Sequence, residues 1–154
     1  MEKRIIPNEI LLNSASELLA EGRDVEIMVK GYSMRPYLES EQDSVLLRKR
    51  DTVEVGDVVL AEIAPGHYVL HRVWSIEGDK VTLMGDGNCV GKERCLTRNV
   101  KGTVELFLKA DGRKVKPGKG KVWRAFLPVR KYIFHFHGLY RRAKGILKKL
   151  KFWK

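Results

Sequence analysis

A serine in a constrained turn and a histidine in a later strand-like run are the residues that could do chemistry in this sequence. Ser33 follows an apolar run and stands between Gly31 and Pro36, residue types that favour a fixed turn. A serine hydroxyl becomes a nucleophile when a neighbouring base removes its proton, and histidine suits that task near neutral pH. Alternation along HYVLHRV places His71 among apolar neighbours, whereas His67 adjoins a proline-glycine turn and is expected to be solvated. Ser33 and His71 therefore predict acyl-transfer chemistry.

The other residues with ligand chemistry do not predict a metal site. His67 and His71 stand four residues apart, and Cys89 and Cys95 stand six apart, so neither pair has the tight spacing of structural zinc sites. We therefore expect no metal and no cofactor, with both cysteines as reduced thiols. Arg72 faces away from His71 in an alternating strand and is expected to form a structural ion pair.

Short strands must position these residues, after one helix at the N-terminal end. Apolar residues at helical spacing predict a helix over 8–20, with Ile10, Leu11, Ala15, Leu18 and Leu19 on its apolar face. Strand-like runs follow over 25–30, 44–48, 57–63, 67–76, 80–84 and 100–109. Turn residues rather than helices separate them. The pattern predicts a mainly β domain over residues 1–110, with a coiled antiparallel sheet or a barrel-like form.

Charge divides the chain into two parts. Residues 1–112 hold 15 Lys and Arg against 19 Asp and Glu, whereas residues 113–154 hold 15 Lys and Arg and no acidic residue. Residues 111–122 are rich in Gly and Lys and are expected to form a mobile linker. Residues 123–154 are expected to form a basic tail, with an amphipathic helix over about 129–152.

The basic tail has three candidate partners. An anionic membrane surface is the favoured one, because the apolar face of the tail is rich in aromatic residues and its other face is cationic. Packing of the tail on the β domain and binding of nucleic acid are the alternatives. The basic residues form no recognised nucleic-acid-binding module, which makes nucleic acid the weaker of them.

The N-terminal residues do not predict export. The first 22 residues contain four glutamates and lack the apolar run and cleavage site of a signal peptide. No window holds the roughly 18 apolar residues that a transmembrane helix needs. We therefore expect a cytoplasmic protein, attached peripherally at the cytosolic face of the membrane through its tail.

Four short blocks of the sequence resemble the type I signal peptidase superfamily of serine proteases, which includes the self-cleaving SOS-type repressors. The blocks stand in the family's order over residues 25–110: GYSMRPYL at 31–38, GDVVL at 56–60, HRV at 71–73 and GDGN at 85–88. Histidine in the third block is similar to the endoplasmic-reticulum and archaeal type, whereas bacterial signal peptidases and the repressors use lysine. The resemblance implies a signal-peptidase-type β fold.

The resemblance also implies roles for individual residues. Ser33 would be the nucleophile, His71 the general base, and the backbone N–H of Ser33 part of the oxyanion hole. Gly31 occupies the position where some members carry a hydroxyl side chain. The family's orienting Asp, several residues beyond the fourth block, is missing. Asp86 is favoured as the orienting carboxylate, Glu93 is the alternative, and a Ser/His dyad without an acidic partner is the third option.

The implied function is that of a serine endopeptidase acting on peptide or protein substrates, with leader or signal-type segments as candidates. No DNA-binding helix-turn-helix precedes the β domain, which counts against a self-cleaving repressor. The alternative is a catalytically decayed signal-peptidase-like fold that binds a membrane surface or nucleic acid through its basic tail.

Overall fold

The computed structural model describes residues 8–88, 90–125 and 129, and divides the chain into two units, Met1–Gly120 and Lys121–Lys154. The first unit is mainly β, with one short N-terminal helix and one antiparallel sheet of eight strands in its described part. Its elements are α1 (Asn8–Ala20), β1 (Val25–Met28), β2 (Ser44–Arg48), β3 (Val58–Ala64), β4 (His67–Glu77), β5 (Lys80–Met84), β6 (Glu93–Leu96), a short 3-10 helix (Thr97–Asn99), β7 (Val100–Leu108) and β8 (Lys114–Val115).

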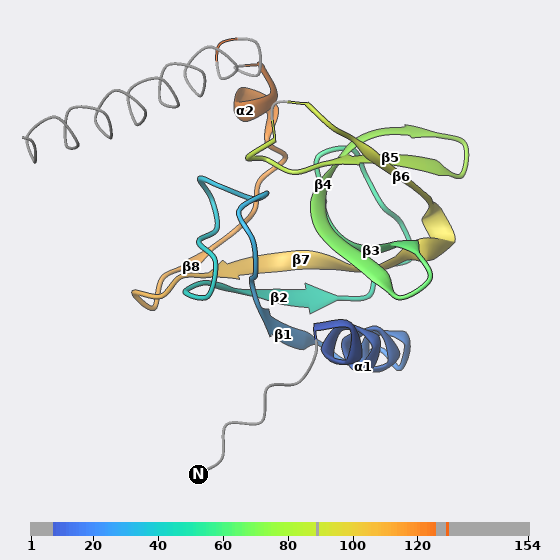
Figure 1. The fold of residues 1–154 in the computed structure, drawn as a ribbon, viewed down its shortest axis with the longest axis horizontal. Helices are drawn as coiled ribbons and strands as arrows, with labels where there is room; N and C mark the ends of the chain where they lie inside the picture. The colour runs from blue at the N-terminus through green and yellow to red at the C-terminus, as the bar shows by residue number, and fades with distance from the viewer. Residues whose placement is uncertain (1–7, 89, 126–128, 130–154) are drawn as a thin grey trace, which may run out of the picture. The chain divides into compact units, whose positions relative to one another are not determined.

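Strand β7 joins two parts of the sheet that are distant in sequence. The strand order is β1-β2-β7-β3-β4-β5-β6, so β7 has β2 on one side and β3 on the other (Figure 1). Beyond the stretch that pairs with β3, Phe107 and Leu108 of β7 pair with β8. The sheet is strongly curved but not closed, which corrects the expectation of a barrel-like form.

Strand β3 is buried on both faces because each face covers a separate apolar cluster. Val58 and Leu60 belong to the cluster that includes Leu19 of α1. Val59 and Ala61 point the other way, into the cluster shared by β4 and β5. This double burial explains why β3 has a nearly continuous apolar sequence rather than an alternating one.

The predicted N-terminal helix forms with the predicted bounds, but its buried face differs from the expected one. Ala15 and Leu19 are buried and Leu12 packs against the same cluster, whereas Ile10 is 57% exposed and Leu11 is also exposed. Leu19 lies so close to β7 that a β carbon at residue 102, a glycine, would come within 2.9 Å of its Cδ1. The helix therefore packs on the sheet mainly through Ala15 and Leu19.

The segment expected as a linker over 111–122 is partly built into the β unit. Residues 114–115 form β8, and the unit continues to Gly120. The reason is a set of long-range contacts with the β domain, described below, which composition alone does not reveal. Helix α2 (Lys121–Ala125) belongs to the second unit, and the rest of the predicted basic tail, apart from Val129, lies outside the described residues. Within the described residues, no helix has the length and apolar character needed to cross a membrane.

Candidate functional site

His71 lies in the middle of β4 and is held by a carboxylate. Its side chain is buried, and its Nδ1 lies 2.9 Å from Oε2 of Glu93 at the start of β6. Strand register explains the contact: Val73 of β4 is opposite Leu83 of β5, which is opposite Glu93. Glu93 therefore lies on the same face of the sheet as Val73 and His71. When Nδ1–H donates to this carboxylate, the neutral imidazole keeps a free lone pair on Nε2.

Ser33 lies in the turn-rich segment between β1 and β2, and its neighbours fix that segment. Met34 and Leu38 are buried in the apolar cluster beneath α1, while Ser33 itself stays half-buried. Gly31 has a φ of 90°, in the region that favours glycine, and its N–H donates to Oγ of Ser40 at 2.9 Å. The turn that carries Ser33 is thus held by the Gly31–Ser40 hydrogen bond and by the burial of Met34 and Leu38.

The loop 85–88 packs directly against the backbone of Ser33. The N–H of Gly87 donates to the carbonyl oxygen of Ser33 at 2.7 Å. A β carbon on Gly85 would lie 2.4 Å from the same oxygen and 3.0 Å from Cβ of Ser33, so only glycine permits this approach. Met84, directly before this loop, pairs with Arg72, the chain neighbour of His71. The fold therefore brings the Ser33 turn to the end of β5, the strand that pairs with β4, on which His71 lies.

Arg72 and Asp86 form a buried ion pair on the opposite side of β4 from His71. Arg72 is 7% exposed and Asp86 is 4% exposed. Nε of Arg72 donates to both carboxylate oxygens, at 2.8 and 3.1 Å, and Nη2 donates to Oδ2 at 2.7 Å. The structural ion pair expected for Arg72 is present. The carboxylate expected to orient His71 is instead engaged by Arg72 with both oxygens, and Glu93 is the carboxylate bound to the histidine.

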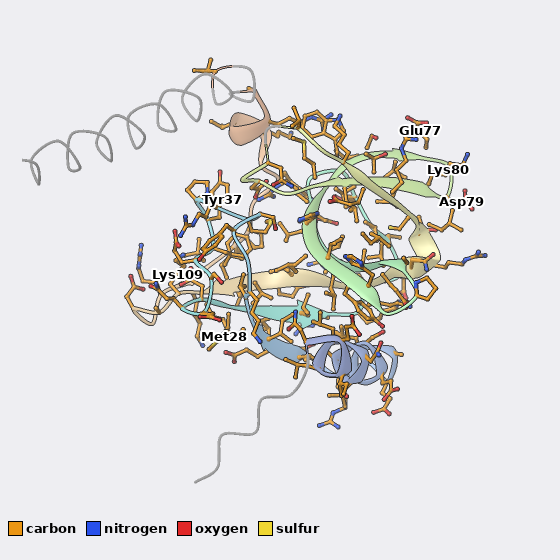
Figure 2. All side chains as sticks on the ribbon, in the orientation of Figure 1. Met28, Tyr37, Glu77, Asp79, Lys80 and Lys109 are labelled. Atoms are coloured by element: carbon orange, nitrogen blue, oxygen red, sulfur yellow. The ribbon has the colours of Figure 1, made fainter. Side chains whose placement is uncertain are left out.

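A second buried carboxylate anchors the far end of the Ser33 segment. Asp43 accepts hydrogen bonds from the N–H groups of Glu39 and Ala110, at 2.8 and 3.0 Å, and pairs with Nζ of Lys109. Lys109 also donates to the carbonyl oxygen of Tyr37 at 2.8 Å, and both residues are labelled in Figure 2. Burial by itself would raise the pKa of Asp43, but the hydrogen bonds from Lys109 and the two backbone groups outweigh it and lower the pKa.

Neither Asp43 nor Lys109 was predicted to take part in the site. Their contacts join residues 66 positions apart, so no local pattern could have found them. Glu93 was an open alternative, and only the pairing of β6 with β5 brings it to His71. The one signal in the sequence was its position soon after the fourth block.

The residues once considered for metal binding do not gather in the described part of the chain. His67 is exposed at the start of β4, and Cys95 is half-buried in β6, where burial raises the pKa of its thiol. No group of three or more metal-ligating side chains occurs among residues 8–88 and 90–125, and Cys89 is not described.

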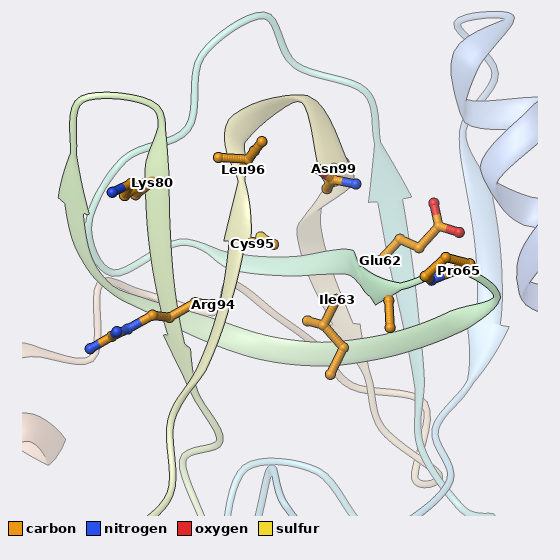
Figure 3. Close-up of a pocket in the computed structure, with 9 residues that line it drawn as sticks. Glu62, Ile63, Pro65, Lys80, Arg94, Cys95, Leu96 and Asn99 are labelled. Carbon is orange, nitrogen blue, oxygen red and sulfur yellow. The ribbon is translucent and has the colours of Figure 1, made fainter.

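A separate hollow lies away from the Ser33 segment. Its volume is about 590 Å³, and it lies between the β3–β4 turn and strand β6 (Figure 3). Its wall includes Ile63, Pro65, Cys95 and Leu96, with Glu62 and Asn99 at its polar side. None of the residues assigned to the chemistry lines it.

No protein-family model matches the chain.

Proposed function

We propose that this protein is a serine endopeptidase in which Ser33 is the nucleophile, His71 the general base and Glu93 the orienting carboxylate. The observation that carries the proposal is the buried His71 ring, bound through Nδ1 to Glu93 at 2.9 Å, in a fold that seats Ser33 on the loop after β5. Peptide or protein chains are the proposed substrates, with leader or signal-type segments as the candidate class.

The chemistry assigned to these residues is acyl transfer through a covalent ester. Nε2 of His71 takes the proton of the Ser33 hydroxyl as Oγ attacks the scissile carbonyl carbon. The backbone N–H of Ser33 is assigned to the oxyanion that develops on the carbonyl oxygen. The imidazolium then gives its proton to the leaving amine, and a water molecule activated by the same ring hydrolyses the ester and regenerates Ser33.

Glu93 suits the orienting role in charge and in position. A carboxylate on Nδ1 selects the tautomer with a free Nε2 and stabilises the imidazolium that forms during the reaction. The extra methylene of Glu, compared with Asp, lets a residue of β6 reach a residue of β4 across the intervening strand β5. In this proposal, Glu93 on the edge strand β6 supplies the orienting carboxylate that the family normally provides as an Asp.

The arrangement of the four family-like blocks supports a signal-peptidase-type fold. Block 31–38 packs on block 85–88 through the glycine contacts described above. Block 71–73 binds block 85–88 through Arg72 and Asp86, and block 56–60 through the carbonyl oxygen of Gly56, which accepts from Nη1 of Arg72 at 2.8 Å. Four segments spread over 58 residues thus meet in one place, as a shared catalytic framework requires.

A fluorophosphonate probe tests the proposal directly, because it reacts with activated serines. We expect the full-length protein to be labelled at Ser33, as located by peptide mass spectrometry, and the variants Ser33→Ala and His71→Gln to lose the label. Ser14→Ala, a change on the exposed face of α1, is the matched control and should label normally. Peptide-library turnover should follow the same pattern.

A folded wild-type protein that takes up no probe and cleaves no library peptide would overturn the peptidase proposal. In that case the alternative is a fold that binds an anionic membrane surface, or the weaker nucleic-acid candidate, through residues 123–154. Sedimentation of the full-length protein with anionic and with zwitterionic vesicles would distinguish binding to an anionic membrane surface from binding to nucleic acid.

A further inference from the structure

Residues 117–120, which we name the strap, cross the buried Arg72 side chain. Nη1 of Arg72 donates to the carbonyl oxygen of Gly118 at 2.8 Å, and Nη2 lies 3.4 Å from that of Pro117. Lys119 of the strap places its Nζ 2.7 Å from both Asp57 and Glu54. These ion pairs raise the pKa of Lys119 and fasten the strap to the turn before β3.

Two glycines let the strap lie directly on the domain. A β carbon on Gly120 would come within 2.7 Å of Cδ and Nε of Arg72, which are held in place by the ion pair with Asp86. A β carbon on Gly56 would come within 2.5 Å of the carbonyl oxygen of Lys119. The contact is therefore close backbone packing rather than a loose surface association.

The strap completes the hydrogen bonding of a buried guanidinium. Asp86 accepts from Nε and Nη2 of Arg72, while the carbonyl oxygens of Gly56 and Gly118 accept from Nη1. Without the strap, a buried donor would lose its partner, and the orientation of Arg72 would be less constrained. Asp86 lies between Gly85 and Gly87, the two residues that contact the Ser33 turn.

We propose that the strap is a positioning element of the active site. It holds Arg72, Arg72 holds Asp86, and the loop around Asp86 holds Ser33 at the position from which it reacts. The inference rests on the proposed peptidase function, and it adds a segment that lies outside the region of family resemblance, residues 25–110.

The test compares two glycines of the strap in the full-length protein. Gly120→Ala and Gly118→Ala both place alanine at a positive φ, 63° and 61°, so they carry the same kind of backbone strain. Only the change at 120 drives a methyl group into Arg72, because nothing lies within 4 Å of a β carbon at 118. The matched pair therefore separates displacement of the strap from general strain.

We expect Gly120→Ala to slow fluorophosphonate labelling of Ser33 at least about tenfold relative to Gly118→Ala. Labelling should still reach one probe per chain, because a displaced nucleophile reacts slowly in every molecule whereas partial unfolding would lower the final yield. Amide hydrogen exchange at Gly87, whose N–H binds the Ser33 carbonyl oxygen, should accelerate in the same variant and not in Gly118→Ala.

The two readouts keep the two proposals distinguishable. If wild type is not labelled, the peptidase proposal fails, while exchange at Gly87 still decides whether the strap holds the loop. If the two alanine variants match in labelling rate and in Gly87 exchange, the strap proposal is overturned. If Gly120→Ala does not fold, Lys119→Met replaces it, with Lys119→Arg expected to restore the wild-type labelling rate; equal rates for the two Lys119 variants would overturn the strap proposal.

Discussion

Two neighbouring residues of β4 each bind a carboxylate, but the two pairs differ in character. Arg72 and Asp86 are both buried and are joined by three hydrogen bonds. His71 and Glu93 are joined through one contact, and the Glu93 side chain is 29% exposed at the edge of the sheet. In the first pair a guanidinium contacts both oxygens of its carboxylate, whereas in the second an imidazole contacts one oxygen through Nδ1.

The difference shows that one strand can carry a fully enclosed pair and a partly solvated pair side by side. The Arg72–Asp86 pair can be fully enclosed because hydrogen bonds satisfy both the guanidinium and the carboxylate. In the proposed mechanism His71 accepts and releases a proton, and a partly solvated carboxylate such as Glu93 can tolerate both states. Alternation along β4 keeps the two pairs on opposite faces, so that each has its own environment.

The largest expected effect comes from breaking the enclosed pair. Asp86→Asn leaves the charge of Arg72 buried without its counterion, so the free energy of unfolding should fall by about 3–5 kcal/mol. Urea denaturation of the purified variant measures this loss. Glu105→Gln removes the partner of Arg50 from an exposed pair and should change stability by less than about 1 kcal/mol. Equal losses in the two variants would contradict the comparison.

Breaking the other pair should affect chemistry more than stability. Glu93→Gln removes the charge that, in the proposed mechanism, stabilises the His71 imidazolium, so labelling of Ser33 by the fluorophosphonate should slow about 10²-fold. The urea midpoint should stay close to that of wild type, because Glu93 is partly solvated. Glu77→Gln, at the exposed end of β4, is the control. A large loss of stability with normal labelling would reverse the assignments of the two pairs.

The contribution of Asp43 to the free energy of unfolding should depend on pH. Its pKa is lowered in the folded protein, so its stabilisation is present above the unfolded pKa, near 4, and is lost as the pH falls through the lower folded value. Asp43→Asn should cost about 1.5–3 kcal/mol at pH 7. Urea titrations between pH 7 and pH 2 should show that this cost shrinks with acid. A constant cost across that range would contradict the assignment, and Asp79→Asn in an exposed turn serves as the control.

The smallest effect concerns the residue next to Glu93. Nζ of Lys92 lies 4.2 Å from the centroid of the Trp74 ring, a cation–π contact that holds the start of β6. Such contacts contribute about 0.5–1 kcal/mol at exposed sites. Lys92→Met should therefore slow labelling of Ser33 by roughly two- to fivefold, while Lys92→Arg should retain the wild-type rate. Identical rates in the two variants would show that Glu93 needs no support from this contact.

The predictable parts of the fold are those with local apolar patterns. Strands β2 and β5 were predicted with their observed bounds, because SVLLR and KVTLM are apolar runs bordered by turn residues. Strand β6, ERCL, was missed because two of its four residues are charged. It is a strand because it pairs with β5, and such pairing depends on tertiary context rather than on propensity.

The site follows the same division between local and long-range information. The Ser33 turn and the glycines of loop 85–88 were visible as blocks in the sequence. The choice between Asp86 and Glu93 was not, because it depends on strand register and on the direction in which Arg72 leaves β4. The packing of the strap was hidden for a related reason: its partner, Arg72, is 45 or more residues away in the chain.

The position of β7 has a consequence for how the chain matures during synthesis. The Ser33 turn belongs to the β1–β2 part of the sheet and His71 belongs to the β3–β6 part, and β7 is the strand that joins them. Because β7 begins at Val100, a growing chain has made both residues long before the strand that unites their halves. Hairpins such as β3–β4 can form early from local contacts. The Ser33 turn and the His71–Glu93 pair therefore become parts of one sheet only after β7 has been synthesised and has left the ribosome.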